Sequence, residues 1–156
     1  MRFLFCDRII QIHKGESIEG TKGFSLSEEF LNGHFEVLPL VPGTIFIETM
    51  AQFLGWLIIY SHDFNYLPII SLMDDIEVMP NMVPGFEACV YAQMKSTTRS
   101  DSLGRAEIRV EGEIIARADR MIYRHFAVPD PMSLKKQFNL MVRPPGSPKA
   151  SWKTHG

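Results

Sequence analysis

The sequence predicts an α+β protein in which a curved antiparallel β-sheet wraps around one long apolar helix. Residues 44–60, TIFIETMAQFLGWLIIY, would be apolar on all sides of a helix except at Glu48 and Gln52, which is typical of a helix enclosed by other structure. Segments on both sides of it are rich in β-forming residues, and several alternate polar and apolar side chains, as half-buried strands do. With 156 residues, the chain is long enough for one domain with a sizeable core.

The segment before the helix predicts two strands and a short helical turn. Residues 3–12 are rich in β-forming side chains, residues 13–16 are turn material, and residues 17–24 read as a returning strand. Residues 25–30, SLSEEF, place a serine ahead of two acids, as in the first turn of a helix. The central helix is expected to begin near Thr44. Any helical structure that continues to residues 65–66 is expected to end at Pro68, because proline interrupts a helix.

The second half of the chain predicts four strands and then a separate tail. The strands are expected at residues 69–78, 86–97, 105–110 and 114–125, with loops at 79–85 and 99–104 and a tight turn at 111–113. We therefore assign residues 1–126 to one domain and residues 127–156 to a proline-rich tail. Within the tail, Leu134, Phe138 and Met141 would share one face of a short helix over residues 133–141.

Composition and charge argue against several classes of function. The formal net charge is -2 and no run of Lys or Arg is present, so nothing indicates nucleic-acid binding. No Cys/His cluster predicts a metal site and no glycine-rich loop predicts a phosphate site, so we expect no cofactor. Asp7 interrupts the short apolar run at the N-terminus, which does not read as a signal peptide, and the expected location is the cytoplasm. Glu48 inside residues 44–60 favours a buried helix over a membrane span.

The stretch from Gly33 to Gln52, GHFEVLPLVPGTIFIETMAQ, carries the candidate chemistry. It places His34 in a loop punctuated by prolines, a Pro-Gly turn at the predicted start of the helix, and Glu48 one turn inside the helix. Gln52 follows Glu48 by four residues, so the two side chains share a helix face and can form a hydrogen bond. A base, backbone N–H donors and an acid are the groups needed for proton transfer next to a carbonyl.

These residues resemble the 3-hydroxyacyl-(acyl-carrier-protein) dehydratases of fatty-acid synthesis, which have the hotdog fold and are FabA/FabZ-like. The resemblance extends from about residue 3 to residue 125. Its strongest parts are Gly33-His34-Phe35, Pro39, Pro42-Gly43, Glu48 and Ala51-Gln52, and a weaker match is the Val83-Pro84-Gly85 loop. In hotdog thioesterases the helix acid occurs without this histidine, so the presence of both residues favours dehydration.

The resemblance implies a role for each candidate. His34 would remove the C2 proton of a 3-hydroxyacyl thioester, since a neutral imidazole titrates near working pH. Glu48 would supply a proton to the leaving hydroxyl, because a carboxyl group in an apolar setting holds its proton to higher pH. The backbone N–H groups of Gly43 and Thr44 would stabilise the thioester oxygen.

By the same resemblance, the Leu40 carbonyl would accept a hydrogen bond from the other ring nitrogen of the histidine. The four-residue spacing would let Gln52 orient the acid. In the family, the histidine and the acid of one site come from different subunits. This implies a homodimer, possibly a trimer of dimers, acting on thioesters of acyl carrier protein or coenzyme A.

Two departures from the family pattern keep other functions open. Glu36-Val37 stand where the family usually has Pro-Gly, and Glu77-Val78-Met79 occupy a region that is often basic in the family. The second departure weakens the case for an acidic carrier protein. The alternatives are a hotdog thioesterase and a hotdog protein that binds acyl chains or partners without catalysis. His13, His62, His125 and His155 are interpreted as surface or structural residues.

Overall fold

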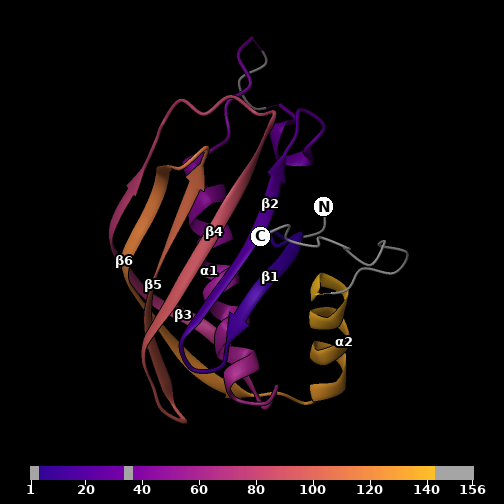
Figure 1. The fold of residues 1–156 in the computed structure, drawn as a ribbon, viewed down its shortest axis with the longest axis vertical. Helices are drawn as coiled ribbons and strands as arrows, with labels where there is room; N and C mark the ends of the chain where they lie inside the picture. The colour runs from indigo at the N-terminus through magenta and orange to yellow at the C-terminus, as the bar shows by residue number, and fades with distance from the viewer. Residues whose placement is uncertain (1–3, 34–36, 143–156) are drawn as a thin grey trace, which may run out of the picture.

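The computed structural model describes residues 4–33 and 37–142 of the chain. It contains a six-stranded antiparallel sheet in the order β1-β2-β4-β5-β6-β3, and the sheet curves around the helix α1 (Figure 1). The elements in chain order are β1 (Arg8–His13), β2 (Ser17–Phe24), the 3-10 turn η1 (Glu29–Leu31), α1 (Gly43–Ser61), β3 (Tyr66–Val78), β4 (Phe86–Thr97), β5 (Asp101–Val110), β6 (Glu113–Ala127) and α2 (Pro131–Val142). This is the hotdog architecture that the sequence predicts, and the fold class is confirmed.

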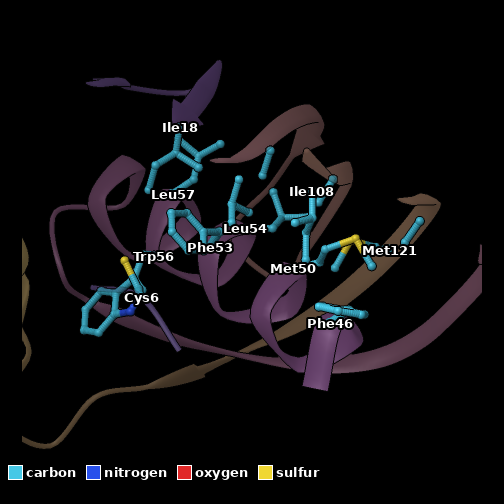
Figure 2. Packing of buried hydrophobic residues seen from close by; sticks show 14 of the residues in the cluster. Cys6, Ile18, Phe46, Met50, Phe53, Leu54, Trp56, Leu57, Ile108 and Met121 are labelled. Atoms are coloured by element: carbon cyan, nitrogen blue, oxygen red, sulfur yellow. The ribbon is translucent and has the colours of Figure 1, made fainter. Parts of the chain in front are cut away.

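Helix α1 contributes more buried hydrophobic residues to the core than any other described element. Side chains from several of its faces are fully buried, and Figure 2 shows Phe53 and Leu57 toward Ile18 while Met50 lies toward Met121. Among the described residues, α1 is also the one helix long and apolar enough to cross a membrane by length and composition. However, 61% of its apolar window is buried inside the fold, so the sheet, rather than lipid, covers much of its apolar surface.

The element boundaries differ from the sequence prediction at residues 101–104, at the helix end and at Pro68. The sequence predicts a loop at residues 99–104, whereas residues 101–104 form the first part of β5, which runs from Asp101 to Val110. Helix α1 ends at Ser61, after which Asp63 and Phe64 adopt left-handed φ angles of 55° and 63° that turn the chain. Pro68 then lies inside β3 opposite His125, instead of ending the helix. A proline is tolerated there because β3 is an edge strand, where a missing N–H donor can face away from the sheet.

Two glycines allow the helix to lie close against the sheet. A Cβ atom at Gly104 in β5 would come within 2.6 Å of the Gln93 carbonyl oxygen and 2.8 Å of the Leu54 side chain on α1. A Cβ atom at Gly20 in β2 would come within 2.6 Å of the Phe53 ring. At Gly20 the nearest atom is the Arg8 carbonyl oxygen of β1, at 2.1 Å. At both positions a side chain would therefore collide with a neighbouring strand as well as with α1, and glycine is required by the close approach of all three.

We predict that Gly104→Ala destabilises the protein by about 1–3 kcal/mol, the usual cost of forcing an extra carbon into a packed core. The midpoint and slope of urea unfolding measure this change. Gly23→Ala on β2 is the matched control, since its Cβ would meet nothing closer than 3.5 Å. Equal midpoints for the two variants would contradict the close-packing argument.

Two histidines that are distant in the sequence, His62 and His125, lie close together at the C-terminal end of α1. His62 Nε2 lies 2.7 Å from Thr97 Oγ1, Thr97 Oγ1 lies 2.7 Å from Ser102 Oγ, and Ser102 Oγ lies 2.8 Å from His125 Nε2. The two imidazole rings are 5.0 Å apart, centre to centre. This chain of hydrogen bonds connects the C-terminal end of α1 to β4, β5 and β6. It is consistent with the interpretation of His62 and His125 as structural residues.

The pKa of His62 is lowered from its ordinary value, first by burial and then by the neighbouring His125, with Lys14 adding to the effect and Asp63 opposing it. A histidine with a lowered pKa binds fewer protons when the protein is folded than when it is unfolded. Its contribution to stability is therefore complete above the unfolded-state pKa of about 6.5 and is lost as the pH falls below it.

We therefore predict that the midpoint of urea unfolding falls between pH 8 and pH 5.5, and that His62→Gln reduces this fall. Glutamine can still donate a hydrogen bond to Thr97 but does not titrate. His13→Gln is the control, because His13 is an exposed histidine on β1. An identical pH dependence in the wild type and the His62 variant would show that His62 is not responsible.

Candidate active site

Glu48 lies on a face of α1 that the sheet of its own chain leaves partly uncovered. This face borders a groove of about 360 Å³, within the size range of small-molecule sites. Six α1 residues form the floor of the groove, and the segment before β1, strand β3, Tyr123 of β6 and helix α2 form its walls. The lining residues are Leu4, Glu48, Ala51, Gln52, Gly55, Trp56, Ile59, Leu67, Pro68, Ile69, Ile70, Tyr123, Leu134 and Gln137.

The Gln52 side chain connects Glu48 to the segment that precedes β1. The backbone N–H of Phe5 donates to Gln52 Oε1 over 2.8 Å, and Gln52 Nε2 donates to Glu48 Oε1 over 2.9 Å. Because the amide oxygen faces Phe5, the amide NH₂ group faces the acid. The hydrogen bond expected from the four-residue spacing is thus present, and Phe5 adds a constraint on amide orientation that no sequence motif indicates.

Tyr123 is a residue of this site that sequence reasoning missed. It lies on β6 with only 2% of its surface exposed, and its hydroxyl donates to the Ala51 carbonyl oxygen over 2.6 Å. Burial raises the pKa of Tyr123 well above its ordinary value, and Glu48 in its ionised form raises it further. The phenol therefore stays protonated and fixes the turn of α1 between Glu48 and Gln52. The alternation along β6 places Tyr123 on an inward face, but it does not identify the helix turn that it binds.

The start of α1 presents backbone N–H groups. Pro42 occupies the N-cap, and Gly43 and Thr44 are the first two helical residues. The first amides of a helix have no acceptor within it, and the helix dipole makes this end positive. A Cβ at Gly43 would lie 3.0 Å from the Val78 side chain, so glycine lets the helix begin close to the end of β3.

The loop that contains the predicted base is only partly described. His34 and Glu36 lie outside the described residues, so the His34–Glu48 distance remains a prediction, as does the hydrogen bond to the Leu40 carbonyl. The flanking residues are placed: Gly33 has a left-handed φ of 72°, and the Val37 side chain is fully exposed. The loop end is tied down where Val41 N–H donates to the Met82 carbonyl over 2.9 Å.

Acids and arginines pair across β3 and β6. Arg117 binds Glu77 over 3.0 Å, and Arg120 binds Asp74 over 3.1 Å. Glu77 and Arg117 also line a second hollow of about 200 Å³ at the end of β3. Over the described ranges, no three His, Cys, Asp or Glu side chains gather in a way that could hold a metal ion.

Comparison with known proteins places this chain in a family. Residues 1–119 match the model of the FabA-like domain. The chain is 27% identical over 120 residues to the 3-hydroxyacyl-(acyl-carrier-protein) dehydratase FabZ of Listeria monocytogenes serotype 4b (strain CLIP80459), an alignment that covers 76% of this chain and 83% of the relative. It is 30% identical over 126 residues to the enzyme of the same name from Psychrobacter arcticus, covering 78% and 86%.

Solved structures with the same fold include enzymes of two kinds. One chain of the dehydratase heterocomplex ApeI:P from Xenorhabdus doucetiae aligns with a TM-score of 0.67 at 14% identity, over 88% of this chain and 90% of that one. Thioesterase superfamily member 2 of zebra fish aligns with a TM-score of 0.57 at 12% identity, over 74% and 78%. At these identities the likeness concerns the fold alone. The family model covers most of the chain, including the motif from His34 to Gln52, and the protein therefore belongs to the FabA-like domain family.

Proposed function

We propose that this protein is a hydro-lyase that converts (3R)-3-hydroxyacyl thioesters into trans-2-enoyl thioesters in fatty-acid, related lipid or polyketide synthesis. The observation that carries the proposal is the Glu48–Gln52 pair, held at 2.9 Å on the floor of a largely apolar groove. The curated relatives named as dehydratases support it, as does His34 within the Gly-His-Phe motif. The cytoplasm is the proposed location.

The reaction removes a proton from C2 and a hydroxyl group from C3. In the proposed mechanism His34 takes the C2 proton, and negative charge develops on the thioester oxygen. In this mechanism the N–H groups of Gly43 and Thr44, at the positive end of α1, stabilise that charge. The base and the oxyanion donors then act on the same carbonyl-bearing half of the substrate.

The leaving hydroxyl needs a proton, which Glu48 supplies. The C3–O bond breaks, water departs, and the electrons of the former C2–H bond form the C2–C3 double bond. His34 ends protonated and Glu48 ends ionised, so one proton passes from the imidazole to the carboxylate, through solvent, before the next turnover. Gln52 donates to Oε1 of Glu48, which stabilises the carboxylate that this step produces and positions the acid for the reverse transfer.

We further propose that the working unit is a homodimer. Strand β3 is an edge of the sheet, and its apolar residues Leu67, Ile69, Ile70 and Leu72 are each 38–49% exposed. An edge strand with unpaired backbone groups and apolar side chains is a template for pairing with another strand. The same strand borders the groove beside Glu48, so a partner there could bring its own His34 loop to the site.

The carrier of the thioester is proposed as acyl carrier protein or coenzyme A. The named relatives indicate the first. In this chain, however, Arg117 and Arg120 on β6 are already paired with Glu77 and Asp74, so an acidic carrier that approached this surface would have to compete with those acids. Assays therefore need both carriers.

We predict that His34→Ala and Glu48→Gln each lower the rate of enoyl thioester formation about 10²–10⁴-fold, the usual contribution of a positioned acid or base. Ultraviolet absorbance of the conjugated product, with 3-hydroxyacyl thioesters of several lengths on both carriers, measures the rate. His13→Ala and Glu87→Gln are matched controls, because both residues are exposed and lie outside the groove.

Near-normal rates in both site variants would end the dehydratase proposal. Release of free thiol, followed in the same samples, would instead indicate thioester hydrolysis on this fold. Binding of acyl thioesters with neither product would indicate a protein that binds acyl chains without catalysis.

We also predict that the two inactive variants restore activity when they are mixed and allowed to exchange subunits. If His34 of one chain serves Glu48 of its partner, a mixed dimer has one site with both variant residues and one intact site. At equal ratios, mixed dimers make up half of the population, and activity should recover to about a quarter of the wild-type rate. Light scattering establishes the oligomeric state. Stable mixed dimers without recovery would show that each site is built within one chain.

A further inference from the structure

Helix α2 lies beyond the part of the chain that matches the family model, yet it forms a wall of the groove that contains Glu48. The match ends at residue 119, whereas α2 runs from Pro131 to Val142. In Figure 1, α2 lies beside β1, at the edge of the sheet. Leu134 and Gln137, one turn apart on α2, both line the groove.

The helix is attached firmly to one half of α1. Phe138 is 5% exposed, and its ring stacks on Tyr60 with centres 5.3 Å apart and contacts Trp56 at 6.1 Å and Phe64 at 5.4 Å. Met141, one turn further on, is 3% exposed. These contacts fix α2 against the C-terminal half of α1, so its groove-lining residues are held in place by packed aromatic side chains.

The groove therefore has two chemically different ends. The carboxyl group of Glu48 and the amide group of Gln52 lie at one end of the α1 face, and Trp56 and Ile59 lie toward the other, where α2 is anchored. Eleven residues of α-helix separate Glu48 from Ile59, a rise of about 16 Å. An acyl chain whose C3 lies at Glu48 and which follows this face of α1 would reach the side chains of α2.

We propose that α2 sets the length of the acyl chain that the groove accepts, with Leu134 as the residue that limits it. This inference rests on the proposed function for the orientation of the substrate. The occupant is an acyl chain, because the lining is apolar apart from the polar groups near Glu48 and Gln137 on α2, and because the groove opens directly onto the candidate acid.

The test compares two substitutions that change the wall in opposite directions. Leu134→Trp should shift the profile toward shorter acyl chains and Leu134→Ala toward longer ones. The ratio of kcat/KM for the longest accepted chain to that for the shortest should move by at least about tenfold, because each methylene group that gains or loses contact changes binding about fourfold. Leu140→Trp and Leu140→Ala are the matched controls, since Leu140 is 46% exposed on the same helix.

A second readout separates this inference from the proposed function. Calorimetric binding of acyl thioesters of graded length to the Glu48→Gln variant, with and without each Leu134 substitution, requires no turnover. A length preference that shifts with Leu134 supports the inference even if the wild type dehydrates nothing. If the enzyme turns over but its dependence on acyl-chain length does not change when Leu134 is substituted, the inference is overturned and the dehydratase proposal remains intact. A dimerisation constant that shifts while the length preference does not would mean that α2 contacts a second copy instead.

Discussion

The structure depends on one constraint: an apolar helix must lie close against a sheet that covers only part of it. Gly20 and Gly104 make the approach possible, because a Cβ at either position would collide both with a carbonyl oxygen of a neighbouring strand and with Phe53 or Leu54 of α1. The sheet encloses one side of the helix, and the face that runs from Glu48 to Ile59 borders the groove. The same packing that buries the core therefore creates the surface on which the chemistry is proposed to occur.

A polar group on that face needs a hydrogen-bond partner, since an unpaired buried donor or acceptor is costly. Three hydrogen bonds satisfy polar groups on this face. Gln52 donates to Glu48 within the helix, Phe5 N–H in the segment before β1 donates to Gln52, and the Tyr123 hydroxyl on β6 donates to the Ala51 carbonyl oxygen. Each interaction fixes the α1 turn that bears Glu48. Only one of the three lies within a single element, and this explains why the sequence indicates the acid more clearly than it indicates what positions the acid.

The fold could be predicted from the sequence because its signals are local. The largely apolar stretch that forms α1 and the strand patterns that form β2 and β4 correspond closely to the structure. The prediction that Pro68 ends the helix is wrong, because the position of this proline in an edge strand depends on the order of strands in the sheet. The sequence does not predict the pairing of His62 with His125 for a similar reason, since it joins residues from the ends of two distant elements.

The direction of α1 relates the two proposals. Backbone donors and positive helix dipole occur only at the N-terminal end of a helix, so charge stabilisation on this face belongs near Gly43, Thr44 and Glu48. The C-terminal half offers no such donors, and most of the side chains around it are apolar; α2 adds Leu134 and the amide of Gln137. This asymmetry fits a substrate whose thioester group lies near the N-terminal end of α1 and whose acyl chain lies along the C-terminal half. Substitutions in α2 can then change the preferred acyl-chain length without disturbing Glu48, Gln52 or the start of α1.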